Sequence, residues 1–133
     1  MKGIFKEQYF VSIEHEISWE QSIRKASEPL LNDLIIEPSY VEDMIDNVNR
    51  FGPYIVILPN IAFAHAEPKG NVYKNCVAVL LIEEGVIFNS SHDPVKMVLV
   101  IAAKTKEDHI MLFSKLSKIF MDADKVEKLL KAR

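Results

Sequence analysis

The stretch Cys76-Val77-Ala78-Val79-Leu80-Leu81-Ile82 decides the fold, because it is strand-sized, rich in β-branched residues and apolar at every position. A strand that is apolar throughout, rather than at alternate positions, is buried on both faces. A second strand-sized and largely apolar run covers residues 95–102, and a third covers residues 54–63. Pro59-Asn60 interrupts the third run, which predicts two short strands or one bulged strand. Residues 85–88 can form a further short strand.

Helices are predicted on either side of these strands. Ser18 and Gln21 have the spacing of a capping box that starts a helix, within which Pro29 should cause a kink or shift the end. A second box at Ser39 and Glu42 predicts a helix that stops at Gly52. Thr105 is expected to cap a third helix, and a last turn or two runs to Leu130. The predicted fold class is α/β (α+β), with a single mixed β-sheet flanked by helices on both faces.

Composition narrows the functional classes. The 133 residues suit one domain, and the net charge of −3 gives no electrostatic reason to expect nucleic acid. No apolar run approaches the roughly 20 residues of a membrane span, and the N-terminus lacks a signal-peptide core, so a cytoplasmic location is expected. Cys76 is the only cysteine, which excludes an internal disulfide and a multi-cysteine zinc site. It is interpreted as a core residue.

Two histidines stand where strands give way to a loop or a helix. His65 closes the run that begins at Tyr54, and His109 falls in the first turns of the helix that Thr105 caps. A helix N-terminus disfavours imidazolium, so a histidine there is biased toward its neutral form. Neutral imidazole can attack phosphorus or hydrogen-bond a phosphate oxygen. We therefore expect His65 to be the nucleophile and His109 to orient it or steady the phosphate.

Other chemistries fit less well. His65-Ala66-Glu67 spells the H-x-E opening of zinc deaminases, but the P-C-x-x-C element that must accompany it is absent. Metalloprotease H-E-x-x-H and Gly-rich phosphate loops are also absent, and no metal or cofactor is called for. The run Ser90-Ser91-His92-Asp93 holds serine-protease residue types, but neighbours in sequence cannot form a triad unaided. His15 and His92 are interpreted as structural or solvated, and a structural role for His65 and His109 also stays open on spacing alone.

The segment from Gly52 through Ala66 resembles the active-site segment of enzyme IIA of the bacterial phosphoenolpyruvate-dependent sugar phosphotransferase system, mannitol/fructose type. Its Gly52-Pro53-Tyr54 opening and Pro59 are most similar to the ascorbate-type branch. The later landmarks, from Asp93-Pro94 to Asp108-His109, match the same family, and the resemblance covers most of residues 1–133 as a single domain.

The resemblance implies a phosphotransferase whose His65 takes a phosphoryl group from the phosphocarrier protein HPr. His65 then passes the group to an enzyme IIB, which in related branches accepts it on a cysteine of its own, and thereby serves the membrane component IIC. His109 is implied to lie beside His65 and assist. Uptake of ascorbate or a related sugar is the leading expectation. The alternatives are a regulatory phospho-acceptor, either a paralogue or a detached domain of a transcriptional regulator, and an interaction domain without activity.

The chain departs from the family pattern at three positions near His65. Ala64 stands where a proline is usual, Asn60 where a glycine is usual, and Glu67 where an arginine is common. A carboxylate 4 Å from a phosphohistidine in solvent would repel it by about 1 kcal/mol. Lys69 can offset this charge if its loop folds back. These positions bear on the transfer rate and on the choice of partner.

Overall fold

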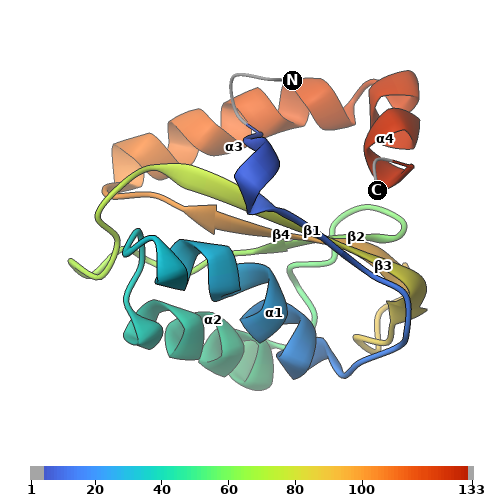
Figure 1. The fold of residues 1–133 in the computed structure, drawn as a ribbon, viewed down its shortest axis with the longest axis horizontal. Helices are drawn as coiled ribbons and strands as arrows, with labels where there is room; N and C mark the ends of the chain where they lie inside the picture. The colour runs from blue at the N-terminus through green and yellow to red at the C-terminus, as the bar shows by residue number, and fades with distance from the viewer. Residues whose placement is uncertain (1–4, 132–133) are drawn as a thin grey trace.

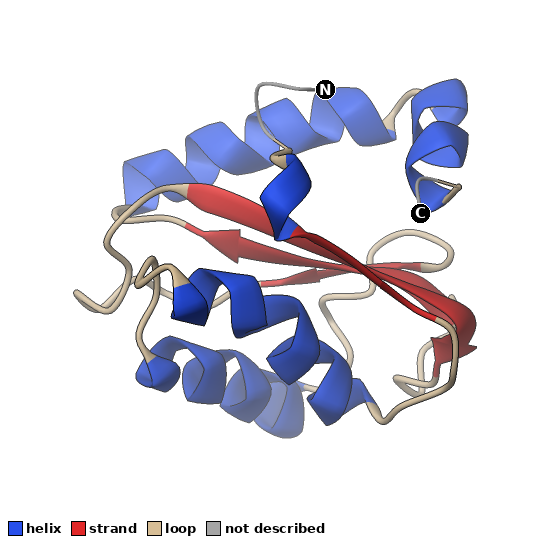
Figure 2. Ribbon diagram, viewed as in Figure 1, coloured by secondary structure: helices blue, strands red, loops and turns tan. Residues whose placement is uncertain are grey.

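One mixed sheet organises the chain in the computed structural model, which describes residues 5–131. Four strands lie in the order β1-β3-β4-β2: β1 (Phe10–Ile13), β3 (Cys76–Val86), β4 (Val95–Ala102) and β2 (Ile61–Ala64). The two central strands, β3 and β4, are antiparallel, whereas each edge strand runs parallel to its neighbour. The predicted single mixed sheet is confirmed (Figure 2).

Helices cover both faces of this sheet, as expected. Helices α1 (Trp19–Asn32) and α2 (Pro38–Phe51) pack on one face, and α3 (Lys106–Phe120) and α4 (Ala123–Leu130) lie on the other (Figure 1). A short 3-10 helix, η1 (Glu7–Tyr9), leads into β1. In β3, Ala78, Leu80 and Ile82 belong to the core beneath α1 and α2, and the residues between them belong to the core beneath α3. Burial on both faces thus explains the uninterrupted apolar strands.

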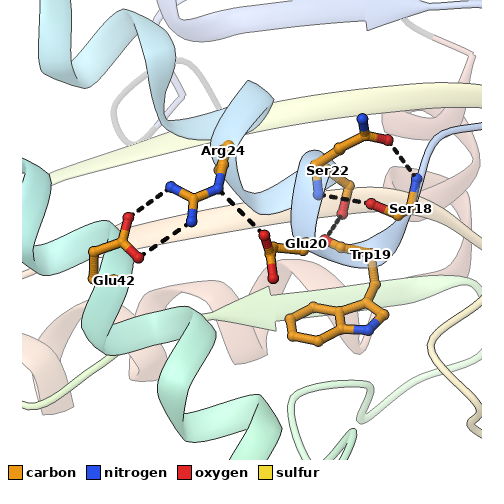
Figure 3. A network of polar contacts seen from close by, with 7 residues as sticks. Ser18, Trp19, Glu20, Ser22, Arg24 and Glu42 are labelled. Carbon is orange, nitrogen blue, oxygen red and sulfur yellow. Dashed lines mark hydrogen bonds and ion pairs between the residues drawn. The ribbon is translucent and has the colours of Figure 1, made fainter.

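Local signals fixed several helix ends. Ser18 and Gln21 form the predicted capping box, and Arg24 of α1 pairs with Glu42 of α2 at 2.6 Å (Figure 3). The backbone N–H of Gly52 bonds to Val48 at the end of α2, where the φ of +81° suits glycine. The Thr105 side chain caps α3 by accepting from the N–H of Asp108. These interactions confirm the predicted ends of three helices.

The prediction of a second capping box, at Ser39 and Glu42, is wrong. Helix α2 begins two residues earlier than this box predicts, with Pro38 as its first residue and Glu37 as an N-cap that makes no side-chain cap bond. Proline favours the first helical position because its φ is preset and its missing N–H would have no partner there. The hydroxyl of Ser39 instead accepts from the Asn71 side chain at 3.1 Å. Helix α1 continues past Pro29 to Asn32, so this proline does not end it.

The strand predictions need three corrections. Only Ile61–Ala64 of the segment 54–63 forms a strand, and an isolated bridge joins Leu58 to Ile61 across the Pro59-Asn60 turn. Residues 85–88 are no separate strand, because β3 runs on to Val86 through an irregularity in its pairing with β4. Strand β1 was not predicted. It pairs with residues 79–82, far along the chain, and no local signal announces that pairing.

Candidate active site

The sheet topology brings the two predicted histidines together. His65 directly follows β2, and α3, which carries His109, follows β4. Because β2 and β4 are parallel neighbours, the segments that leave them emerge at the same edge of the sheet. The imidazole centroids of His65 and His109 are 5.2 Å apart, with the ring planes inclined by 74°. The expectation that these two residues meet is thereby confirmed in geometry.

His65 has a defined tautomer. Its Nδ1 lies 2.7 Å from the backbone oxygen of Phe63. A carbonyl oxygen can only accept, so Nδ1 carries the proton and donates it, and Nε2 keeps its lone pair. Burial lowers the pKa of His65 below its ordinary value, and the bond to Phe63 opposes this only in part. His65 is therefore a neutral imidazole whose Nε2 can act as a nucleophile.

His109 is the fourth residue of α3, and its N–H donates to the carbonyl of the N-cap Thr105 at 3.0 Å. Its ring stacks on Phe113, one turn further along, with centroids 4.7 Å apart. Burial, and secondarily the neighbouring charge of His65, lower the pKa of His109. Both imidazoles are therefore held neutral near pH 7, by burial first rather than by the helix N-terminus that the sequence suggested for His109.

An open cleft of about 440 Å³ gives access to both histidines. It is lined by Asn47, Tyr54, His65, Ala66, Glu67, Pro68, Lys106, His109 and Ile110. Tyr54 contacts His65 edge to face with centroids 5.7 Å apart, and burial raises the pKa of its hydroxyl, which therefore remains a donor. Lys106 is the only lysine or arginine among the described residues that line the cleft. A dianionic group can enter here and meet donors and one cation.

A buried tyrosine that the sequence analysis did not single out supports the site from below. Tyr40 of α2 is fully buried, and its hydroxyl donates to the carbonyl of Ile101 at 2.5 Å and accepts from the N–H of Ala66 at 3.2 Å. Burial raises the pKa of Tyr40 to about 12. One hydroxyl therefore joins the segment after His65 to the end of β4. Tyr40 lies on the same helix face as the buried Met44 and Val48, but this spacing gives no hint of its hydrogen-bond partners.

The remaining candidates lie outside the cleft or lack partners within it. His15 is exposed and contacts Glu84 at 3.4 Å, His92 lies in a turn, and Cys76 is buried in β3 as predicted. Glu67 lines the cleft, and no ion pair joins it to Lys69 in the described part of the chain. Within residues 5–131, no three His, Cys, Asp or Glu side chains gather as a metal site would require.

The unusual Asn60 has a structural explanation. Its φ is +70°, a left-handed conformation that glycine adopts freely and that asparagine tolerates better than most residues. Its side-chain amide donates to the carbonyl of Pro94 at 2.7 Å, and its N–H donates to His92 at 3.0 Å. Asparagine therefore occupies a conformation suited to glycine and ties the start of β2 to the loop before β4.

Comparison with known proteins identifies the family. The sequence matches the model described as "Phosphoenolpyruvate-dependent sugar phosphotransferase system, EIIA 2" over residues 4–133. The chain belongs to this family. It is accordingly an EIIA phosphotransferase component, in agreement with the resemblance at its two histidine segments. Among the described residues, no helix is both long and apolar enough to cross a membrane.

Relatives of this EIIA component differ in the sugar that their names carry. The ascorbate-specific EIIA component of Mycoplasma pneumoniae is 29% identical over 81% of this chain and 69% of its own length. The cryptic mannitol-specific enzyme IIA of Escherichia coli is 27% identical over 99% of this chain and 90% of its own, and its solution structure superposes with a TM-score of 0.85 over 98% and 88%. The mannitol IIA of Escherichia coli, in complex with phosphorylated IIB, gives 0.75 at 26% identity over 97% and 98% of the two chains.

Proposed function

We propose that this EIIA component carries a phosphoryl group on Nε2 of His65, taking it from phosphorylated HPr and passing it to an enzyme IIB. The observation that carries the proposal is a neutral imidazole whose Nδ1 proton is committed to Phe63, leaving Nε2 as the free nucleophile in an open cleft. In the first step, the Nε2 lone pair forms a bond to phosphorus as the donor's P–N bond breaks. The donor imidazole keeps that electron pair, so no cofactor or metal is consumed.

The second step reverses the roles. A thiolate of IIB, the acceptor type of related branches, forms a P–S bond as the P–N bond to His65 breaks, and His65 returns to its neutral form. The carbonyl of Phe63 fixes the ring orientation in both steps. Because burial disfavours imidazolium, the His65 ring leaves as a neutral imidazole, with the proton on Nδ1, at the moment the phosphoryl group moves to the thiolate. The same interaction thus serves both acceptance and release.

Charge on the transferred group must be stabilised, because phosphoryl transfer depends mainly on positioning and on neutralising the equatorial oxygens. Lys106 supplies a cation on the cleft wall, and His109 and the Tyr54 hydroxyl supply hydrogen-bond donors. The N-terminal end of α3, where the helix dipole is positive, adds to the positive potential. The carboxylate of Glu67, which also lines the cleft, opposes this stabilisation because it repels the anionic phosphoryl group. We assign His109 the assisting, phosphate-stabilising role and Glu67 a moderating one.

The proposed partners are HPr, an enzyme IIB and, through IIB, a membrane IIC, with the chain acting in the cytoplasm. Support for IIB comes from the Escherichia coli mannitol IIA, whose solved complex contains phosphorylated IIB. We propose ascorbate or a related sugar as the transported substrate, from the ascorbate-specific relative and the Gly52-Pro53-Tyr54 segment. Glu67 favours one alternative, an interaction domain without activity, because a carboxylate in the cleft slows the exchange of an anion.

Intact-mass analysis tests the proposal. The protein is incubated with phosphoenolpyruvate, enzyme I and HPr, as are the variants His65→Ala, His109→Ala and His15→Ala. His15 is the matched control, because it is exposed and lies outside the cleft. An acid-labile gain of one phosphoryl mass is expected in the wild type and in His15→Ala, with none in His65→Ala and a slower gain in His109→Ala.

Two results separate the proposal from its alternatives. No mass gain in the wild type, while another IIA is phosphorylated under the same conditions, would remove the carrier role and leave an interaction domain. A stable phosphoprotein that no IIB discharges, tested with the IIB of an ascorbate system and that of a mannitol system, would favour the regulatory role. Discharge by only one of them would also indicate the sugar.

A further inference from the structure

Phe113 contacts both histidines of the proposed site. Its ring stacks nearly parallel on His109, with an interplanar angle of 13° and a centroid distance of 4.7 Å, and it meets His65 edge to face at 5.1 Å. It lies one helical turn beyond His109, a spacing at which side chains on the same face of a helix meet. One aromatic ring therefore touches both the expected nucleophile and its assistant.

The surroundings of Phe113 differ from those of an ordinary core residue. Its side chain is half-buried, and it borders an apolar pocket of about 240 Å³ whose lining includes Phe63, Leu116 and Phe120. The core does not close over the ring on that side. Its nearest ring neighbours are the two imidazoles, because the centroid distance from Phe113 to Phe63 is longer, at 6.3 Å.

We propose that Phe113 is a positioning residue for phosphoryl transfer, whose flat face fixes the rotation of the His109 imidazole beside His65. The proposal rests on the function proposed above. His109 makes no side-chain hydrogen bond among the described residues, so the stack on Phe113 and the contact with His65 are what orient its ring. Leucine at position 113 would keep an apolar side chain but lose the flat face.

The expected effect is moderate. The added stability of an aromatic pair corresponds to roughly a 2- to 12-fold change in the population of the aligned rotamer. Phe113→Leu is therefore expected to slow phosphorylation of His65 by roughly 2- to 12-fold. Phe113→Tyr, which keeps the ring, is expected to stay close to the wild-type rate. In a chain without an imidazole at position 109, Phe113→Leu is expected to slow phosphorylation no further.

Phe120 offers a matched control for loss of an aromatic side chain. It lies on the same helix and meets Phe63 edge to face at 5.1 Å, but no ring contact joins it to His65 or His109 in the part of the chain described. Phe120→Leu therefore removes a core ring that makes no ring contact with either imidazole. Thermal unfolding of each variant reports any loss of folding separately.

The experiment measures single-turnover phosphorylation by phosphorylated HPr in the wild type, Phe113→Leu, Phe113→Tyr and Phe120→Leu. It then repeats Phe113→Leu in a His109→Ala background. A positioning role predicts slowing in Phe113→Leu alone, rescue in Phe113→Tyr, and almost no further slowing in the double variant. Equal slowing in Phe113→Leu and Phe120→Leu, or the same factor with and without His109, would overturn the proposal.

A second readout does not depend on catalysis. NMR titration should show the pKa of His109 rising toward its ordinary value in Phe113→Leu, because the ring that shields it from water is gone, and unchanged in Phe120→Leu. If the wild type takes up no phosphate while a control IIA does, the proposed function fails. The titration then decides the positioning role by itself, and an unchanged His109 would refute it.

Discussion

Removing the hydroxyl of Tyr40 is expected to weaken the fold and the site together. In Tyr40→Phe the ring is retained, so the change deletes one fully buried oxygen rather than opening a large cavity. The N–H of Ala66 loses its acceptor at 3.2 Å, and the carbonyl of Ile101 loses its donor at 2.5 Å. An orphaned buried group costs about 1–3 kcal/mol, which suggests a loss of about 2 kcal/mol in the free energy of unfolding.

For a chain of this length, that loss corresponds to a fall in Tm of about 7 °C. Differential scanning calorimetry measures it directly. Tyr73→Phe is the matched control, because it deletes the same atom from an exposed tyrosine whose hydroxyl bonds to Glu37. The control should change stability by less than about 0.5 kcal/mol. Equal Tm values for the two variants would show that the Tyr40 hydroxyl does not hold the segments together. Slower phosphorylation of His65 is expected only in Tyr40→Phe.

Three further predictions concern charge. If each charge acts through solvent at about 4 Å, Glu67→Gln should speed phosphorylation by about fivefold and Lys106→Gln should slow it by a similar factor. The rates are measured in transfer reactions quenched at timed intervals. Lys104→Gln, which changes a lysine outside the cleft, should leave the rate unchanged. The effects of Glu67→Gln and Lys106→Gln on the rate should shrink in high salt. Because the pKa values of His65 and His109 are lowered from 6.5, the rate should be flat from pH 8 to 6.5 and fall only in more acidic buffer.

The same pKa shifts set a direction for stability. The unfolded chain takes up protons on His65 and His109 near pH 6.5, whereas the folded chain does so only at lower pH. Unfolding is therefore favoured progressively as the pH falls below about 6.5. His65→Ala should reduce this pH dependence in urea titrations. An unchanged dependence would mean that the imidazoles are no more buried than in the unfolded chain.

The parts of the fold that sequence predicts are those with local signals. Uniformly apolar segments identified the central strands, and the Ser18 and Thr105 caps marked the starts of their helices. Strand β1 was not predicted, because Phe10–Ile13 is short and pairs with a part of β3 that is distant in sequence. The second capping box failed because the preference of Pro38 for the first helical position outweighed the Ser39 pattern.

The candidate site was predictable to the level of its two histidines, and no further. Each follows an apolar run, which suggested a place at the end of a strand, and the resemblance to the EIIA family implied that His109 lies beside His65. The partners that orient them come from other parts of the fold. Tyr40, from a helix on the opposite face, bonds to the backbone N–H of Ala66 next to His65, and the stacking of Phe113 on His109 depends on how α3 is rotated against the sheet. Neither contact has a signature in the spacing of residues.

The direction in which His65 points follows from strand alternation. Ile61 and Phe63 belong to the core on the α3 side, whereas Ala62, Ala64 and Ala66 belong to the core beneath α1 and α2. Alternation therefore continues past the end of β2 and places His65 on the α3 side, where His109 and Phe113 lie.

One residue inserted between Phe63 and His65 would turn the imidazole toward the opposite core and separate it from His109. The small alanines on the other side of β2 let α2 approach closely enough for the Tyr40 hydroxyl to reach the backbone at Ala66. Ala64, although it departs from the proline usual in the family, thus suits its place: it is buried, and it keeps the alternation that aims His65. Of the family departures near His65, Glu67 is the one expected to alter phosphoryl transfer, because it lines the cleft itself.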